Sequence, residues 1–270
     1  MKHLLRLFQV SSVKRCFWSG SDYSRHKSAQ IQAAIKLISK LQLAGSESVL
    51  DIGCGDGEIS FMLSRLVNNE VIGLDANSSM IEYAQKTYRA PNLQFQLGHA
   101  LDMTYQNRFN LVTSFSAIHW IRDQPTFLLK VCAALKSKGR IFFFFPNHDT
   151  GTKMHRVVEL FEDVLKADKW RPYFASYVPE LFFYTPEEYR ELMITAGFCE
   201  VEVLTFRHVQ HFQDVSSLRE WWRNVMYPLK YLPPSRHYEF LDDFMALYLQ
   251  ASGGEAVFEY SVLLAQGRKH

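Results

Sequence analysis

The stretch VLDIGCGDGEIS, residues 49–60, decides how the chain is expected to fold. A short apolar run ends in Asp51, and glycines follow at positions 53, 55 and 57. Glycine has no Cβ, so it tolerates positive φ and lets backbone N–H groups meet a ligand directly. A strand, a glycine turn and a helix in this order predict a ligand site at the carboxyl end of a sheet.

The spacing of these glycines indicates which ligand the turn serves. A dinucleotide turn has the pattern G-x-G-x-x-G, whereas this one is G-x-G-x-G with Glu58 next. A carboxylate at Asp51 suits a ligand with a cationic amino group, and Asp75, after the next apolar run, can accept hydrogen bonds from ribose hydroxyls. We therefore disfavour a nicotinamide oxidoreductase. An alternative role for Asp75 is purely structural: its carboxylate could accept hydrogen bonds from the backbone of its own turn and make no contact with a ligand.

Apolar runs and helical patterns largely alternate through the first half of the chain, which predicts an α/β fold with a mostly parallel sheet. Strands are expected at 49–52, 71–74, 93–97, 111–115 and 140–145, and helices at 28–43, 58–66, 79–88 and 125–135. Ser79 is the expected cap of its helix. After Pro146 the pattern predicts helices at 152–169, 185–196, 215–229 and 235–251, and strands at 201–208 and 255–265.

Composition narrows the classes of partner. The chain has 270 residues, 47% of them hydrophobic, and a net charge of +2, which gives no reason to expect nucleic acid binding. No run of 18 apolar residues is present in the sequence, so we expect no integral membrane contact. The four cysteines form no CxxC pair, which favours reduced thiols in a cytoplasmic protein, and we expect no metal site.

Residues 1–20 form a basic amphipathic extension with no acidic residue. Such a segment can be a mitochondrial targeting peptide or a membrane-surface helix, and it can equally be a plain extension. We expect residues 21–270 to form a single domain, with helical cap elements mainly within 150–252.

At this point the sequence resembles the class I S-adenosylmethionine-dependent methyltransferases. VLDIGCGDG is similar to their first motif and GLDANSSMIEYAQ to their second, and the resemblance covers roughly residues 46–146. It implies a Rossmann-like fold with a mostly parallel seven-stranded sheet, helices on both faces and S-adenosyl-L-methionine as cofactor. The positions that it places near the cofactor are Tyr23, Asp51, Gly53, Cys54, Gly55, Asp75, Ala76, Met80, His99, Ala100, Ser114 and Phe115.

The adenine end departs from the family pattern. Many members have an aspartate after the third strand that binds the adenine amino group, and His99 occupies that position here. His99 could accept from the amino group, or Asp102 could take over this contact. Met80 is as compatible with core packing as with adenine.

The stretch FSAIHWIRDQ, residues 115–124, follows the fourth strand, where acceptors lie in this fold. It resembles the juvenile hormone acid methyltransferases and, more loosely, trans-aconitate and malonyl carrier protein methyltransferases, which methylate carboxylates. A carboxylate is already ionised at neutral pH, so its methylation needs positioning by donors rather than a general base. We expect His119 and Trp120 to be these donors, the alternative being that both are core residues.

The predicted function is thus carboxyl O-methylation of a small or medium organic acid, free or carrier-linked, by a monomer or weak homodimer. The alternatives are O- or N-methylation of another small metabolite, or cofactor binding without turnover. The stretch LREWWRNVMYPLKYLPP could line an apolar acceptor pocket with one basic end through Trp221, Trp222, Arg223, Met226 and Tyr227, although a plain core helix is favoured for at least half of these residues. Tyr23 could close over the cofactor or simply pack at the start of the following helix, and we expect Arg122 to be a surface charge.

Overall fold

The computed structural model describes residues 37–39, 41–147 and 153–270, with side chains from residue 159 onward in the last range. The basic N-terminal segment, Tyr23 and most of the helix predicted at 28–43 lie outside the described residues. The predictions for them stay predictions.

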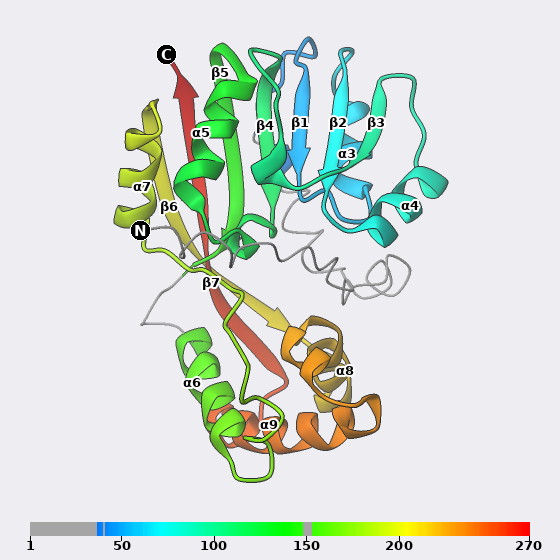
Figure 1. Ribbon diagram of the computed structural model, residues 1–270, viewed down its shortest axis with the longest axis vertical. Helices are drawn as coiled ribbons and strands as arrows, with labels where there is room; N and C mark the ends of the chain where they lie inside the picture. The colour runs from blue at the N-terminus through cyan, green and yellow to red at the C-terminus, as the bar shows by residue number, and fades with distance from the viewer. Residues whose placement is uncertain (1–36, 40, 148–152) are drawn as a thin grey trace, which may run out of the picture.

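Seven strands form one sheet in the order β3-β2-β1-β4-β5-β7-β6 (Figure 1). β1 to β5 are mutually parallel, and β7 runs antiparallel to both β5 and β6. The mostly parallel seven-stranded sheet predicted from the sequence is confirmed. The bounds are β1 (Val49–Ile52), β2 (Val71–Asp75), β3 (Leu93–Leu97), β4 (Phe109–Phe115), β5 (Leu135–Pro146), β6 (Phe198–His211) and β7 (Val257–Lys269).

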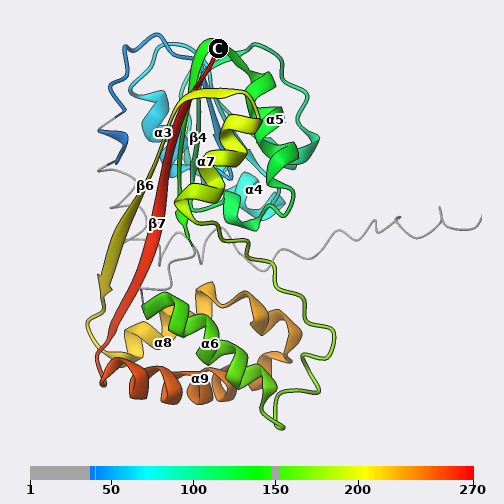
Figure 2. The ribbon, with the colours of Figure 1, turned by 90° about the vertical axis from the view of Figure 1, so that its left-hand side faces the viewer.

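Within the residues that the structure describes, the α-helices form two groups. Four of them accompany the sheet: α3 (Glu58–Ser64), α4 (Ser78–Thr87), α5 (Gln124–Ala134) and α7 (Pro186–Thr195). Three others, α6 (Lys153–Lys166), α8 (Val215–Val225) and α9 (His237–Ser252), gather around the far ends of β6 and β7 as a separate helical layer (Figures 1 and 2). None of the helices in the described ranges is long and apolar enough to cross a membrane.

Several boundaries differ from the sequence prediction. The cap of α4 is Asn77, whose side chain accepts from the N–H groups of Ser79 and Met80, so the prediction of Ser79 as the cap is wrong. α8 ends at Val225, because Pro228 lacks an N–H and the chain continues as the 3₁₀ helix η3 (Tyr227–Tyr231). β6 and β7 are longer than predicted, since they extend beyond the other strands to reach the helical layer.

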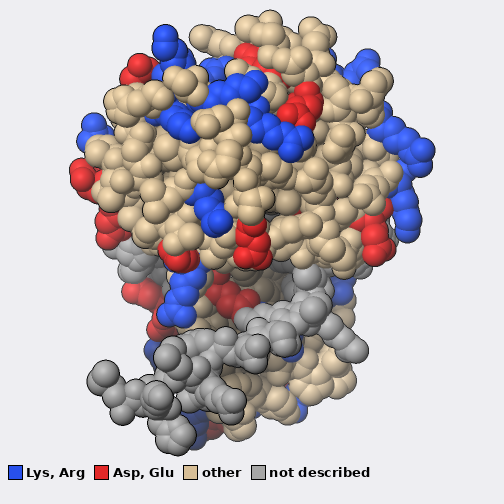
Figure 3. Space-filling model, turned by 45° about the horizontal axis from the view of Figure 1, so that its top comes forward, with Lys and Arg blue, Asp and Glu red and all other residues tan. Residues whose placement is uncertain are grey.

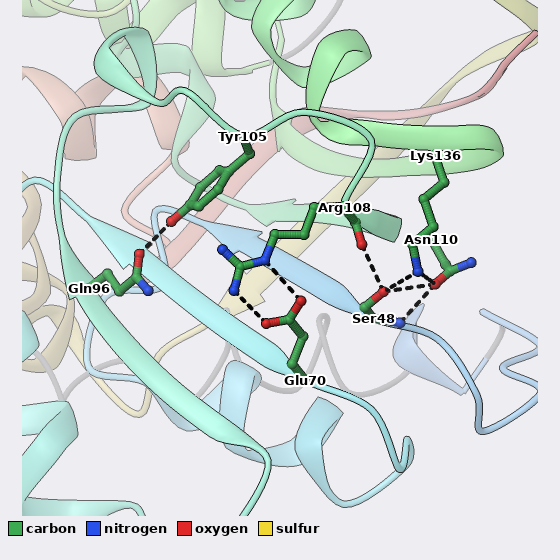
Figure 4. Close-up of polar contacts among 7 residues, drawn as sticks. All are labelled: Ser48, Glu70, Gln96, Tyr105, Arg108, Asn110 and Lys136. Carbon is green, nitrogen blue, oxygen red and sulfur yellow. Dashed lines mark hydrogen bonds and ion pairs between the residues drawn. The ribbon is translucent and has the colours of Figure 1, made fainter.

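Polar side chains form hydrogen bonds and an ion pair at the amino ends of the parallel strands (Figure 4). Asn110 Oδ1 accepts hydrogen bonds from Ser48 Oγ at 2.8 Å and Lys136 Nζ at 3.0 Å. Arg108 pairs with Glu70 at 2.6 Å, and this lowers the pKa of the glutamate. Basic side chains gather on this face with acidic ones among them (Figure 3). The glycine turn opens at the other end, where the strands terminate.

Candidate active site

A cavity of about 650 Å³ lies between the carboxyl ends of β1, β2 and β4 and the helical layer. Its walls come from the glycine turn, the end of β2, the 3₁₀ helix η2 (Ile118–Trp120) and aromatic side chains of α6, α8, α9 and β7. The strand order reverses between β1 and β4, and ligands bind at such a point in open α/β sheets. The volume falls within the usual ~300–1,000 Å³ of small-molecule sites.

The glycine turn packs closely against the η2 segment. Gly53 has φ +70°, and a Cβ built on it would lie 2.1 Å from Cβ of Ala117. Gly53 N–H donates to the Leu74 carbonyl at 2.7 Å, which fixes the turn against β2. Both Gly53 and Gly55 line the cavity, so the glycines serve backbone exposure and close packing together.

Asp75 both braces the turn and faces the cavity. Its Oδ2 accepts from Gly55 N–H at 2.8 Å, and its Oδ1 accepts from Asn77 N–H at 2.8 Å. Burial raises the pKa of this carboxyl, and backbone hydrogen bonds from Asn77, Gly55 and Ala76 oppose the rise. A carboxylate has about four acceptor sites, and Asp75 lies in the cavity wall, so a ligand hydroxyl can still bind there.

Three predicted cofactor positions do not belong to this wall. The Asp51 carboxylate is 2% exposed and accepts from Ser60 Oγ at 2.6 Å and Thr113 Oγ1 at 2.9 Å. Burial raises its pKa to about 6. Ser114 Oγ donates to the Ile52 carbonyl at 2.7 Å, and the Cys54 side chain is buried. The side chains of Asp51, Cys54 and Ser114 are thus buried next to the glycine turn and do not line the cavity.

The predicted adenine positions do lie together. Ala76, Met80, His99 and Ala100 all line the cavity, whereas Asp102 does not; Phe115, predicted only to lie near the cofactor, lines it as well. His99 Nδ1 accepts from Leu101 N–H at 3.2 Å. With Nδ1 accepting, a neutral ring carries its proton on Nε2, so His99 would face a ligand as a donor. The expectation that it accepts from an amino group is therefore not supported by this geometry.

The η2 segment is held from two sides. Gln124, 1% exposed, donates from Nε2 to the carbonyls of Ile118 at 2.7 Å and Ile121 at 3.0 Å. Its Oε1 accepts from Tyr189 of α7 at 3.2 Å. The carbonyl of His119 accepts from Phe182 N–H at 2.8 Å. These bonds position the pair His119–Trp120 in the cavity wall.

His119 is uncharged at neutral pH. The residue is 7% exposed, and burial lowers its pKa to about 3. Its Nδ1 is sealed by protein and has no hydrogen-bond partner, so Nε2 is the ring nitrogen available to a ligand. Trp120 is half-buried and meets the Tyr227 ring edge-on at 5.2 Å between centroids. The predicted donor pair is thus brought together at the cavity, which the glycine turn also lines.

The helical layer supplies the rest of the wall and corrects one prediction. Trp221, Trp222, Met226 and Tyr227 line the cavity as expected, but Arg223 does not, because it pairs with Glu220 at 2.9 Å. Among the described Lys and Arg residues, the one that lines the cavity is Lys230, which pairs with Glu180 at 2.6 Å. Neither Lys230 nor Glu180 was predicted as a site residue from its sequence context. Arg122 is exposed, as expected for a surface charge.

Comparisons with known proteins agree with this geometry. Residues 43–197 match the model of the methyltransferase domain family. The juvenile hormone acid O-methyltransferase of Drosophila melanogaster is 26% identical over 76% of this chain and 72% of its own. The trans-aconitate 2-methyltransferase of Methylobacterium radiotolerans is 25% identical over 93% of this chain and 98% of its own. A Haemonchus contortus phosphoethanolamine N-methyltransferase, solved with S-adenosyl-L-methionine, has the same fold: TM-score 0.62, 14% identity, and 95% of this chain and 59% of that one covered.

Proposed function

The chain belongs to the methyltransferase domain family, and we propose that it methylates the carboxylate of a small or medium organic acid, with S-adenosylmethionine as the methyl donor. The observation that carries the proposal is the neutral His119 and its neighbour Trp120 in the cavity wall, on the segment that packs against the glycine turn. The similarity to a juvenile hormone acid and a trans-aconitate methyltransferase supports the same acceptor class.

The cavity fits the cofactor at its sheet end. Asp75 would accept from the ribose hydroxyls, and Gly53 and Gly55 leave room for close approach to the backbone. Ala76 and Met80 would border the adenine. S-adenosylmethionine, when bound, supplies an electrophilic methyl group on a sulfonium, so that an acceptor carboxylate forms the C–O bond as the C–S bond breaks, with no proton to remove.

The described cavity wall favours an acceptor that is already ionised. Its three carboxylates all have partners: Asp75 holds the backbone, Glu162 pairs with Lys166 at 3.0 Å, and Glu180 pairs with Lys230. His119 could act as a base only weakly, because its low pKa makes it a poor proton acceptor. Neutral donors instead orient a carboxylate without quenching its nucleophilicity. Positioning then supplies much of the rate enhancement.

Variants of His119 test this role. His119→Gln places an amide nitrogen near the former Nε2, whereas His119→Asn places one near the sealed Nδ1. We expect His119→Asn and Trp120→Phe each to lower kcat/KM for acid methylation about 10- to 100-fold, the cost of one lost hydrogen bond to a charged group. His119→Gln should retain most of the activity. Full turnover by a His119→Ala/Trp120→Ala double variant would contradict the proposal.

A further inference from the structure

An ion pair stands in the cavity wall at the junction with the helical layer. Lys230 Nζ lies 2.6 Å from Glu180 Oε2, and the two side chains are only 27% and 25% exposed. The ammonium also lies 5.6 Å and 5.5 Å from the ring centroids of Tyr227 and Tyr231. Within residues 37–147 and 153–270, excluding Lys40, Lys230 is the one Lys or Arg that lines the cavity. Glu180 therefore neutralises this cation in the absence of any ligand.

The pair lies close to the proposed donor residues. The Tyr227 ring contacts both groups: its centroid lies 5.6 Å from the Lys230 ammonium, and it meets the Trp120 indole edge-on at 5.2 Å between centroids. The Tyr227 hydroxyl accepts from the Glu180 N–H at 3.3 Å and is hydrogen-bonded to the Tyr177 hydroxyl. A second polar group on an acceptor held by His119 and Trp120 would meet this pair.

The remaining wall toward the helices is mainly aromatic, although Glu162 of α6 also lies in it. The aromatic side chains are those of Phe161, Trp221, Trp222, Phe244, Phe258 and Tyr260. A carboxylate moved against these side chains would lose its hydration without gaining a partner, which costs several kcal/mol. An apolar group placed there instead gains from leaving water.

We propose that the Glu180–Lys230 pair is a charge selector that restricts the acceptor to acids with one carboxylate and an apolar body. The inference rests on the proposed carboxyl methylation, because it concerns the part of the acid that is not methylated. A second carboxylate near the pair meets the negative charge of Glu180 and a lysine that is already bound. Repulsion of the wrong ligand, rather than attraction of the right one, sets the preference.

The test compares mono- and dicarboxylic acids of eight, ten and twelve carbons. Each is measured for binding by calorimetry to the full chain saturated with S-adenosylhomocysteine, and for methylation rate. We expect the wild-type protein to favour the monoacids at least about tenfold, a difference of ~1.4 kcal/mol. Glu180→Gln keeps the side-chain shape but leaves Lys230 available, so it should reduce the preference about five- to tenfold. The increase in diacid binding expected for Glu180→Gln depends on a free Lys230, so it should be absent from the double variant Glu180→Gln/Lys230→Met.

Glu162→Gln is the matched control. Glu162 also lines the cavity, but it pairs with Lys166 and lies outside the selector, so its loss should leave the ratio unchanged. Unchanged circular dichroism and cofactor affinity would establish that each variant is folded. Equal binding of mono- and diacids by the wild type, or equal shifts in Glu180→Gln and Glu162→Gln, would overturn the selector. Absence of methyl esters from all acids would instead contradict the proposed function, and the binding ratio would still decide the selector.

Discussion

A methyl group added at Gly53 is expected to disturb both halves of the site at once. The Cβ of Gly53→Ala would lie 2.1 Å from Cβ of Ala117, whereas ordinary contacts are 3.4–4 Å, so the glycine turn and the η2 segment must move apart by about an ångström. The positive φ of +70° adds ~1–2 kcal/mol of backbone strain. Overpacking adds ~1–3 kcal/mol. We expect a total loss of ~2–5 kcal/mol in the free energy of unfolding.

Two further variants separate strain from overlap. Gly253→Ala has a similar φ of +72° but nothing within 4 Å, so it should show the strain alone. Ala117→Gly removes the opposing methyl group, so the double variant Gly53→Ala/Ala117→Gly should recover the overlap part of the loss. The stability of this double variant is compared with that of the single variant Ala117→Gly, so that the effect of Ala117→Gly alone is subtracted.

Urea unfolding and steady-state kinetics measure the two consequences. Because displacement of catalytic groups by ~1 Å can cost about 100-fold in rate, we expect Gly53→Ala to lower kcat/KM by that order while Gly253→Ala leaves it unchanged. The reasoning is refuted if Gly53→Ala is no less stable than Gly253→Ala, or if Ala117→Gly fails to restore any activity to Gly53→Ala.

Three other predictions concern charged and titratable groups. Since burial lowers the pKa of His119 to about 3, it stays neutral, and kcat should be flat from pH 6.5 to 9; a rise with an apparent pKa in that interval would indicate a general base. Burial raises the pKa of Asp51 to about 6, so the folded state binds the proton of this carboxyl more tightly than the unfolded state does. Protonated Asp51 therefore contributes stability below about pH 4, and this contribution is lost as the pH rises through 6. Urea titrations should show that Asp51→Asn removes up to about 3 kcal/mol of this pH dependence, and an unchanged slope between pH 4 and 6 would contradict the assignment. Asp75→Asn should weaken S-adenosylmethionine binding about 10- to 100-fold by calorimetry, because an amide donor would face the N–H of Gly55 or Asn77; wild-type affinity would show that the carboxylate serves the turn alone.

Most of the sheet follows from local sequence because its apolar runs are short and bounded. β1 and β3 occupy the predicted residues, since both runs end at turns marked by glycine or proline. The lengths of β6 and β7 were not predictable in the same way. Their outer halves pair with each other beyond the sheet's other strands, so tertiary contact with the helical layer decides where they end.

Some predicted site residues line the cavity and others do not, depending on where each residue lies in its strand. Asp75 is the last residue of β2 and His119 lies beyond the end of β4, and both line the cavity. Asp51 lies within β1, and its side chain instead meets Ser60 and Thr113, a distinction that the glycine motif does not contain. The Glu180–Lys230 pair was missed because it joins residues 50 positions apart, and neither lies in a motif that indicates the other.

The chemistry of the transferred methyl group tests the central claim most directly. The full chain is incubated with S-adenosylmethionine labelled in its methyl group and with panels of organic acids, amines and alcohols. The product is then treated with mild base. The account predicts labelled products from acids only, with the label released as methanol because a methyl ester is hydrolysed. A labelled product that survives base, from an amine or an alcohol, would contradict carboxyl methylation.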